Sequence, residues 1–133
     1  MFYLLDTNTA SFVIKGNVPR VRQRLIRIPA SQVAISAVTA ADLLFGVARR
    51  PEATRLKAIV EEFLARVEVL PWEREAAAAY ADLRAALERA GITISNLDMM
   101  IAAHAVATGS VLVSSDRAFA RIRQLKVEDW TKV

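Results

Sequence analysis

Short apolar runs alternate with longer amphipathic segments along this chain, and this alternation limits the possible fold more than any other feature. The apolar runs occupy residues 2–5, 33–36, 67–70 and 111–113, with a candidate edge strand at 127–130. Strands that alternate with helices are typical of a parallel or mostly parallel sheet covered by helices. We therefore expect a three-layer α/β fold with four to five strands, formed by residues 1–133 as a single domain.

The segments between these runs have the apolar spacing of helices. The helices that we expect span residues 8–15, 19–28, 37–49, a stretch opened by Pro51, residues 73–90 and residues 97–108, with a short helix after Asp116. The helix at 97–108 is apolar on nearly every side, which predicts burial on all faces. Residues 92–94 are compatible with either a strand or a loop.

Composition excludes several classes of protein. Hydrophobic residues make up 54% of the 133 residues and the mean hydropathy is +0.28, so part of the apolar surface is expected to enter a subunit or partner interface. Without cysteine there is neither a disulfide framework nor a thiolate zinc site. No apolar run approaches membrane-spanning length and no signal-peptide pattern is present, so we expect a cytoplasmic protein without membrane contact.

Basic residues gather toward both ends of the chain. The net charge is +4 and the sequence pI is near 10.0. The first basic group is Lys15, Arg20, Arg22, Arg24 and Arg27; the second is Arg117, Arg121, Arg123, Lys126 and Lys132. Such groups suit a polyanion, although arginine-rich helix faces are also ordinary solvated surfaces.

Four aspartates stand near the expected helix starts: Asp6, Asp42, Asp98 and Asp116. Taken singly, each is explained by helix capping or by solvent exposure. Taken together, Asp6 and Asp116 follow strands that end at one edge of a parallel sheet, and Asp98 opens the most apolar helix. Carboxylates that converge at such an edge repel one another, and Mg²⁺ or Mn²⁺ relieves that repulsion. The only histidine, His104, is better explained as a core residue than as a catalytic group.

Four segments that carry these aspartates resemble the PIN-domain family, specifically the VapC-type toxins of bacterial type II toxin–antitoxin pairs. They are LDTN at 5–8, ISAVTAADLLFG at 35–46, LDMMIAAHA at 97–105 and VSSDRAF at 113–119. They occur in the family's order, with the expected strands between them. The resemblance therefore covers essentially the whole chain.

The resemblance implies an endoribonuclease that depends on Mg²⁺ or Mn²⁺ and hydrolyses RNA phosphodiester bonds with metal-activated water. It makes Asp6, Asp42, Asp98 and Asp116 the catalytic residues, with Asp6, Asp98 and Asp116 as metal ligands. Two residues support them: Asn8 is expected to orient Asp6 or to hold the site open, and Ser114 to hydrogen-bond a carboxylate or phosphate oxygen. The partners it implies are structured RNA such as tRNA or rRNA, a cognate antitoxin and a second copy of the chain. Arginines of residues 20–27 and 117–123 are expected to hold the RNA backbone.

Two departures from the family pattern bear on the site. Asp42 stands where the family usually has glutamate, so we expect its shorter carboxylate to reach the metal through a water. Ser114-Ser115 replaces a threonine-asparagine pair, which keeps a hydroxyl but loses an amide. The alternative function is therefore a catalytically weakened PIN-like protein that binds RNA or a partner. A phospho-acceptor receiver domain lacks support because Asp6 has no acidic neighbour, and a haloacid-dehalogenase-type phosphatase would need an aspartate at position 8, where Asn8 stands.

Overall fold

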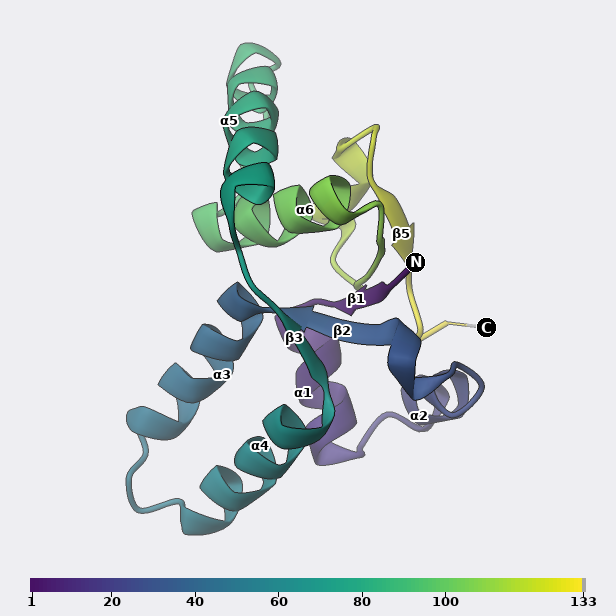
Figure 1. Ribbon diagram of the computed structural model, residues 1–133, viewed down its shortest axis with the longest axis vertical. Helices are drawn as coiled ribbons and strands as arrows, with labels where there is room; N and C mark the ends of the chain where they lie inside the picture. The colour runs from purple at the N-terminus through teal and green to yellow at the C-terminus, as the bar shows by residue number, and fades with distance from the viewer. Residues whose placement is uncertain (133) are drawn as a thin grey trace.

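The centre of the protein is a parallel sheet of five strands, seen in the computed structural model, which describes residues 1–132 (Figure 1). The strands are β1 (Tyr3–Leu5), β2 (Val33–Ser36), β3 (Glu68–Leu70), β4 (Val111–Val113) and β5 (Lys126–Glu128). They lie in the order β3-β2-β1-β4-β5, and every neighbouring pair is parallel. This architecture confirms the predicted α/β sheet and puts β1 at its centre.

Helices cover both faces of the sheet. They are α1 (Thr7–Lys15), α2 (Pro19–Leu25), α3 (Ala37–Ala48), α4 (Thr54–Arg66), α5 (Arg74–Arg89) and α6 (Asn96–Thr108), with 3₁₀ turns η1 (Ala30–Gln32) and η2 (Arg117–Arg121). In Figure 1, α5 and α6 lie above the sheet and α1 to α4 below it. Two apolar clusters result, one under α5 and α6 and one against α1, α2 and α4. The predicted three layers are therefore present.

Helix ends depart from expectation where a cap or turn competes with the helical pattern. Of the two caps that the sequence allows for α1, Asp6 or Asn8, the structure has Asp6, and Asn8 lies inside that helix. The expectation that Pro51 opens a helix was wrong: the Ala53 N–H closes a turn onto the Arg50 carbonyl, and α4 begins at Thr54. Residues 92–94, which were ambiguous, form a loop.

Helix α6 is enclosed as predicted. It lies between α5 and the sheet in Figure 1, and residues 101–105 are all buried. The Trp72 Nε1–H, from the segment that leads into α5, donates to the Met100 carbonyl at 3.0 Å. Asp98 is therefore held on a helix that is packed from several sides.

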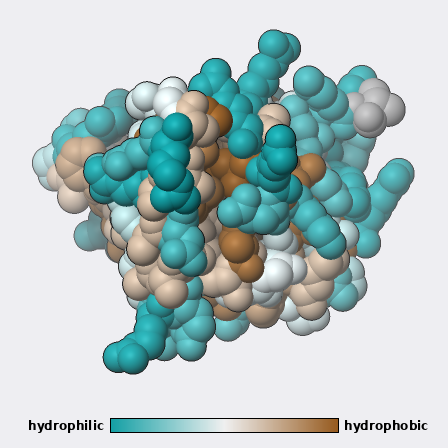
Figure 2. All heavy atoms as spheres, turned by 90° about the horizontal axis from the view of Figure 1, so that it is seen from above, coloured by the Kyte–Doolittle hydropathy of each residue, from teal (hydrophilic) through white to brown (hydrophobic). Residues whose placement is uncertain are grey.

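Some large apolar side chains stay uncovered. Figure 2 shows apolar side chains near the middle of the face that carries α5 and α6, between projecting polar side chains. Exposed large apolar residues in the structure are Met1, Ile26, Leu44, Phe45, Ile59, Leu97 and Val127. Exposed apolar patches commonly mark partner surfaces, as the apolar composition led us to expect. Over residues 1–132, no helix has both the length and the hydropathy that crossing a membrane requires.

Candidate active site

All four predicted aspartates line one cavity at the carboxyl edge of the sheet. The cavity holds about 240 Å³ and is lined by Asp6, Thr7, Asn8, Asp42, Ser95, Leu97, Asp98, Ile101 and Asp116. β1 ends immediately before Asp6, and the end of β4 leads to Asp116. α3 supplies Asp42 and α6 supplies Asp98. Asp6 and Asp116 are helix caps and still converge with Asp42 and Asp98, so capping and convergence are compatible.

Asp6 is fixed between the two central strands. Its backbone N–H donates to the Val113 carbonyl at 3.0 Å, and its Oδ1 accepts from the Thr9 N–H at 2.8 Å. The Thr9 Oγ1–H donates to the same Val113 carbonyl at 3.0 Å. Asp6 is only 4% exposed. These bonds hold the carboxylate in one place at the wall of the cavity.

The surroundings of Asp98 raise the pKa of its carboxyl. Burial raises the pKa of its carboxyl, and the negative charges of Asp116, Asp6 and Asp42 raise it further, against a lowering by the Ser95 hydrogen bond. Ser95 is the N-cap of α6, and its Oγ accepts from the Asp98 N–H at 3.2 Å. A carboxyl in such surroundings favours a bound proton or a bound cation.

Asp116 and Ser114 form a tight turn after β4. The Ser114 Oγ accepts from the Asp116 N–H at 3.0 Å, and the Asp116 Oδ1 accepts from the Ala118 N–H at 2.9 Å. Ser114 is buried, whereas Asp116 is exposed. In this structure the Ser114 hydroxyl oxygen thus positions the backbone of Asp116, and its contact is with an amide rather than with a carboxylate.

Asp42 and Asn8 are held less firmly. Asp42 is half-buried and lines both the acidic cavity and a neighbouring groove between α1, α3 and α4. Asn8 is exposed and lines the acidic cavity. The donor that orients Asp6 is the Thr9 amide, a role we had expected of Asn8.

No protein cation neutralises this cavity within residues 1–132. The ion pairs of that part of the chain lie elsewhere: Arg24–Glu128, Arg66–Glu62 and Arg84–Glu88. Nor do any three histidine or acidic side chains of the same residues form a ready-made set of metal ligands. A hard divalent cation that keeps several of its waters fits this donor set, because it needs few direct carboxylate contacts.

The contact of His104 with Ser36 was not anticipated from the sequence. His104 on α6 is 2% exposed, and its Nδ1 lies 2.7 Å from the Ser36 Oγ. Ser36 ends β2 and caps α3, where its Oγ accepts from the Val38 N–H at 3.1 Å. The core position of His104 agrees with the prediction, but its partner is far away in the sequence and no local pattern pointed to it.

Comparisons with known proteins identify the family of this chain. The PIN domain family model matches residues 3–125. The tRNA(fMet)-specific endonuclease VapC of Salmonella typhimurium is 37% identical, over 96% of this chain and 97% of that protein. Ribonuclease VapC2 of Haemophilus influenzae strain Rd is 34% identical, over 96% and 97%.

Solved structures show the same fold. DNA-bound VapBC from Salmonella typhimurium matches with a TM-score of 0.90 and 37% identity, covering 98% of each chain. VapBC2 from Rickettsia felis, bound to a DNA fragment from its promoter, matches with a TM-score of 0.88 and 31% identity, covering 96% of this chain and 98% of that one. The chain belongs to the PIN-domain family, which is one of metal-dependent nucleases, and within it to the VapC ribonuclease toxins.

Proposed function

We propose that Asp6, Asp98 and Asp116 bind a catalytic Mg²⁺ or Mn²⁺ in this VapC-type endoribonuclease, with Asp42 completing the acidic site. The observation that carries this assignment is the convergence of four carboxylates on one cavity without a cationic partner among the described residues. Uncompensated carboxylates at close range are unfavourable, and a divalent cation removes that penalty. All-oxygen donors favour Mg²⁺ or Mn²⁺ over zinc.

Each residue has a distinct role in this proposal. Asp6 is the most rigid ligand, because the Thr9 amide and the Val113 carbonyl hold its position. Asp98 is the ligand that gains most from a cation, because burial and neighbouring charges raise its pKa. Asp116 is placed by Ser114 and lies at the exposed rim, where substrate would enter.

The bound metal would supply Lewis-acid chemistry, activating water and offsetting the charge of the scissile phosphate. The chain itself contributes orientation and exclusion. Leu97 and Ile101 line one side of the cavity and limit the water around the carboxylates. Asp42, shorter than the usual glutamate, assists through a bridging water. His104 takes no part in proton transfer, because it is buried against Ser36.

The substrate that we favour is a structured RNA, with tRNA as the first candidate. The support is the Salmonella typhimurium relative, which is named a tRNA(fMet)-specific endonuclease. A tRNA presents unstacked loop bases that a protein can read. Because we favour a tRNA substrate, we infer that the protein acts in the cytoplasm.

We further propose a cognate antitoxin and a homodimer as its assembly. Solved neighbours from Salmonella typhimurium and Rickettsia felis are VapBC complexes. The exposed apolar residues Leu44, Phe45 and Ile59 offer surface of the kind that a protein partner covers.

RNA cleavage by the wild type and by Asp6→Ala tests the proposal, with initiator tRNA as substrate and with Mg²⁺, Mn²⁺ or a chelator present. We expect cleavage only by the wild type and only with metal. A second readout is thermal unfolding, in which Mn²⁺ should raise the melting temperature of the wild type more than that of Asp6→Ala. Asp82→Ala, which removes an exposed carboxylate from α5, is the matched control. Equal cleavage by wild type and Asp6→Ala would contradict the assignment.

A further inference from the structure

A basic pocket lies beside the C-terminal segment, apart from the acidic cavity. It holds about 370 Å³ and is lined by Arg20, Gln23, Arg24, Arg27, Trp130 and Lys132. None of these residues lines the acidic cavity. Arg20, Arg24 and Arg27 are spaced so that a helix and its closing turn bring them to one side. The pocket therefore joins part of the first basic group of the sequence to a lysine from the second.

Arg24 lines this pocket and is held in place by several contacts. Its Nη2 lies 3.2 Å from the Glu128 Oε1, which also accepts from the Trp130 Nε1–H at 3.0 Å. The Arg24 guanidinium carbon lies 5.9 Å from the Tyr3 ring centroid and 5.7 Å from that of Trp130. One carboxylate and two aromatic faces thus fix Arg24, and they use much of its capacity to bind anything else.

The other cations of the pocket remain available. Within residues 1–132, none of the ion pairs involves Arg20, Arg27 or Lys132. All three side chains are exposed. Three uncompensated cations around a hollow, beside a fixed fourth, make a site for an anion with several charges.

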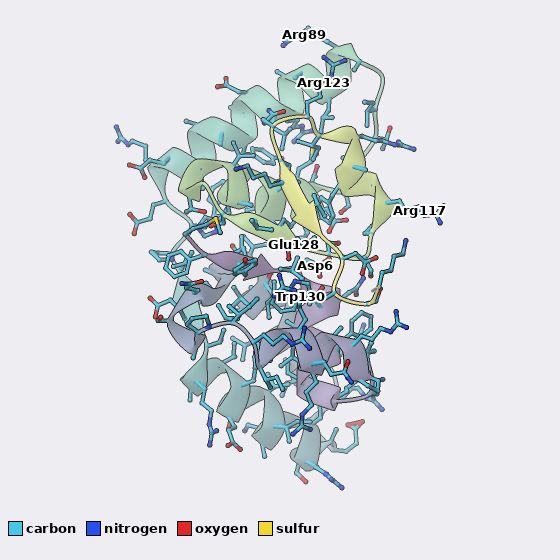
Figure 3. All side chains as sticks on the ribbon, turned by 90° about the vertical axis from the view of Figure 1, so that its right-hand side faces the viewer. Asp6, Arg89, Arg117, Arg123, Glu128 and Trp130 are labelled. Carbon is cyan, nitrogen blue, oxygen red and sulfur yellow. The ribbon has the colours of Figure 1, made fainter. Side chains whose placement is uncertain are left out.

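The pocket meets the sheet at Glu128, the last residue of β5, and at Tyr3, the first residue of β1. Glu128 ends β5, and its carbonyl accepts from the Ser114 N–H at 2.9 Å. The Ser114 Oγ in turn accepts from the Asp116 N–H. Two strand spacings separate Glu128 from the end of β1, which is about 10 Å. Figure 3 shows Glu128 beside Trp130, with Arg89 and Arg123 at the distant end of the molecule.

The side chains that line the pocket are suited to bind the phosphate backbone of a nucleic acid rather than a base. Trp130 is 3% exposed and packs against Tyr3 with ring centroids 5.9 Å apart, so its face is not available for stacking. Arginine and lysine side chains without a base platform contact phosphates, which position a nucleic acid without reading its sequence.

We propose that Arg20, Arg27 and Lys132 form a second phosphate-binding site that holds the RNA backbone outside the acidic cavity. The inference rests on the proposed ribonuclease function and deepens it. The site increases affinity for long or structured RNA and leaves the chemistry at the aspartates unchanged. It acts on the backbone, so its effect is the same for different RNA sequences and weakens as salt rises.

The test compares the triple variant Arg20→Gln/Arg27→Gln/Lys132→Gln with Arg55→Gln/Lys57→Gln/Arg89→Gln, which removes the same charge from α4 and α5. Binding of initiator tRNA is measured by fluorescence anisotropy in chelator, and cleavage is measured in Mn²⁺. We expect the triple variant to lose affinity on the order of tenfold relative to the control, with KM raised and kcat unchanged. The slope of log affinity against log salt should fall in magnitude by about 2.

Several results separate this inference from the function on which it rests. Equal affinity and salt slope in the two variants would overturn the second site, even if both cleave RNA. If the triple variant bound RNA normally but no longer bound a co-expressed antitoxin, the pocket would be a protein-binding site, and the proposed phosphate site would be wrong. Weakened RNA binding by the triple variant, with no cleavage by the wild type, would support the pocket and contradict the ribonuclease function alone. Matching melting temperatures of the two variants establish that folding is not the cause.

Discussion

The Nδ1 atom of His104 lies 2.7 Å from the Oγ atom of Ser36, in the buried interior between α6 and α3. The Ser36 Oγ also accepts from the Val38 N–H, so this hydroxyl has both the His104 ring and the α3 backbone as partners. The contact thus joins the helix of Asp98 to the helix of Asp42.

Replacing His104 by leucine should destabilise the fold. The change leaves the buried Ser36 hydroxyl without its His104 partner, which costs about 1–3 kcal/mol. Urea unfolding of His104→Leu and the wild type measures the loss. Thr39→Val is the contrasting control, because the Thr39 hydroxyl is buried without a partner in the described structure, and removing it should be neutral or stabilising. If His104→Leu and the wild type had the same free energy of unfolding, this contact would not stabilise the fold.

The contribution of His104 should depend on pH. Burial lowers the pKa of His104 from its ordinary value of 6.5, against a smaller raising by the Pro71 backbone. The unfolded chain therefore binds a proton first as pH falls, so the stability that neutral His104 supplies is complete above 6.5 and is lost below it. The difference in unfolding free energy between wild type and His104→Leu should shrink as pH falls below 6.5. A difference that stays constant from pH 8 to pH 5 would show that His104 is not the titrating group.

Asp98→Asn should stabilise the metal-free protein while abolishing its activity. The pKa of Asp98 is raised from 3.8, so the ionised carboxyl destabilises the folded state above its folded pKa, and the amide removes that penalty. In chelator at pH 7.5 the variant should melt at a higher temperature than the wild type, and the gap should close as pH falls toward 3.8. Cleavage should drop by about 100-fold or more, as expected for loss of a group that acts in the transition state. A lower melting temperature in chelator would contradict the charge repulsion that we infer.

Lengthening Asp42 asks whether the missing methylene limits the rate. Asp42 lies at the side of the cavity and is half-buried, so Asp42→Glu is accommodated and should equal or exceed the wild-type rate. Asp42→Ala should lose less activity than Asp6→Ala, because its carboxylate acts through water. Single-turnover cleavage of one RNA by the three variants ranks them. A larger loss in Asp42→Ala than in Asp6→Ala would make Asp42 a direct ligand.

Removing the Ser114 hydroxyl should weaken the turn that carries Asp116. Ser114→Ala deprives the Asp116 N–H of its acceptor, a loss of about 1 kcal/mol, which corresponds to a several-fold drop in cleavage rate. Ser115→Ala, an exposed neighbour, is the matched control and should cleave as the wild type does. Equal rates for the two alanine variants would show that the hydroxyl does not position Asp116.

The parts of the structure that the sequence predicted are those set by local pattern. The strands predicted at residues 33–36 and 111–113 have the same first and last residues in the structure, because each is a short apolar run bounded by polar turns. The convergence of the aspartates was also foreseeable, because parallel strands end at one edge. Local competition explains the errors: the turn after Pro51 takes backbone donors that a helix start would use.

What escaped prediction depends on contacts between distant segments. The bond between His104 and Ser36 and the pocket that joins Arg20 to Lys132 both require knowing how the helices pack against the sheet. No spacing along the chain encodes either. Asn8 was expected to orient Asp6 or to hold the site open, but the donor to Asp6 is the Thr9 amide in the first turn of α1.

The central position of β1 has a consequence for how the acidic cavity forms. The Asp6 N–H pairs with the Val113 carbonyl on β4, a strand far away from β1 in the sequence. Every neighbouring strand pair of the sheet is parallel, so no hairpin can assemble the cavity, and such non-local pairing is slow. A partly folded chain in which β4 has not yet joined β1 therefore lacks the cavity.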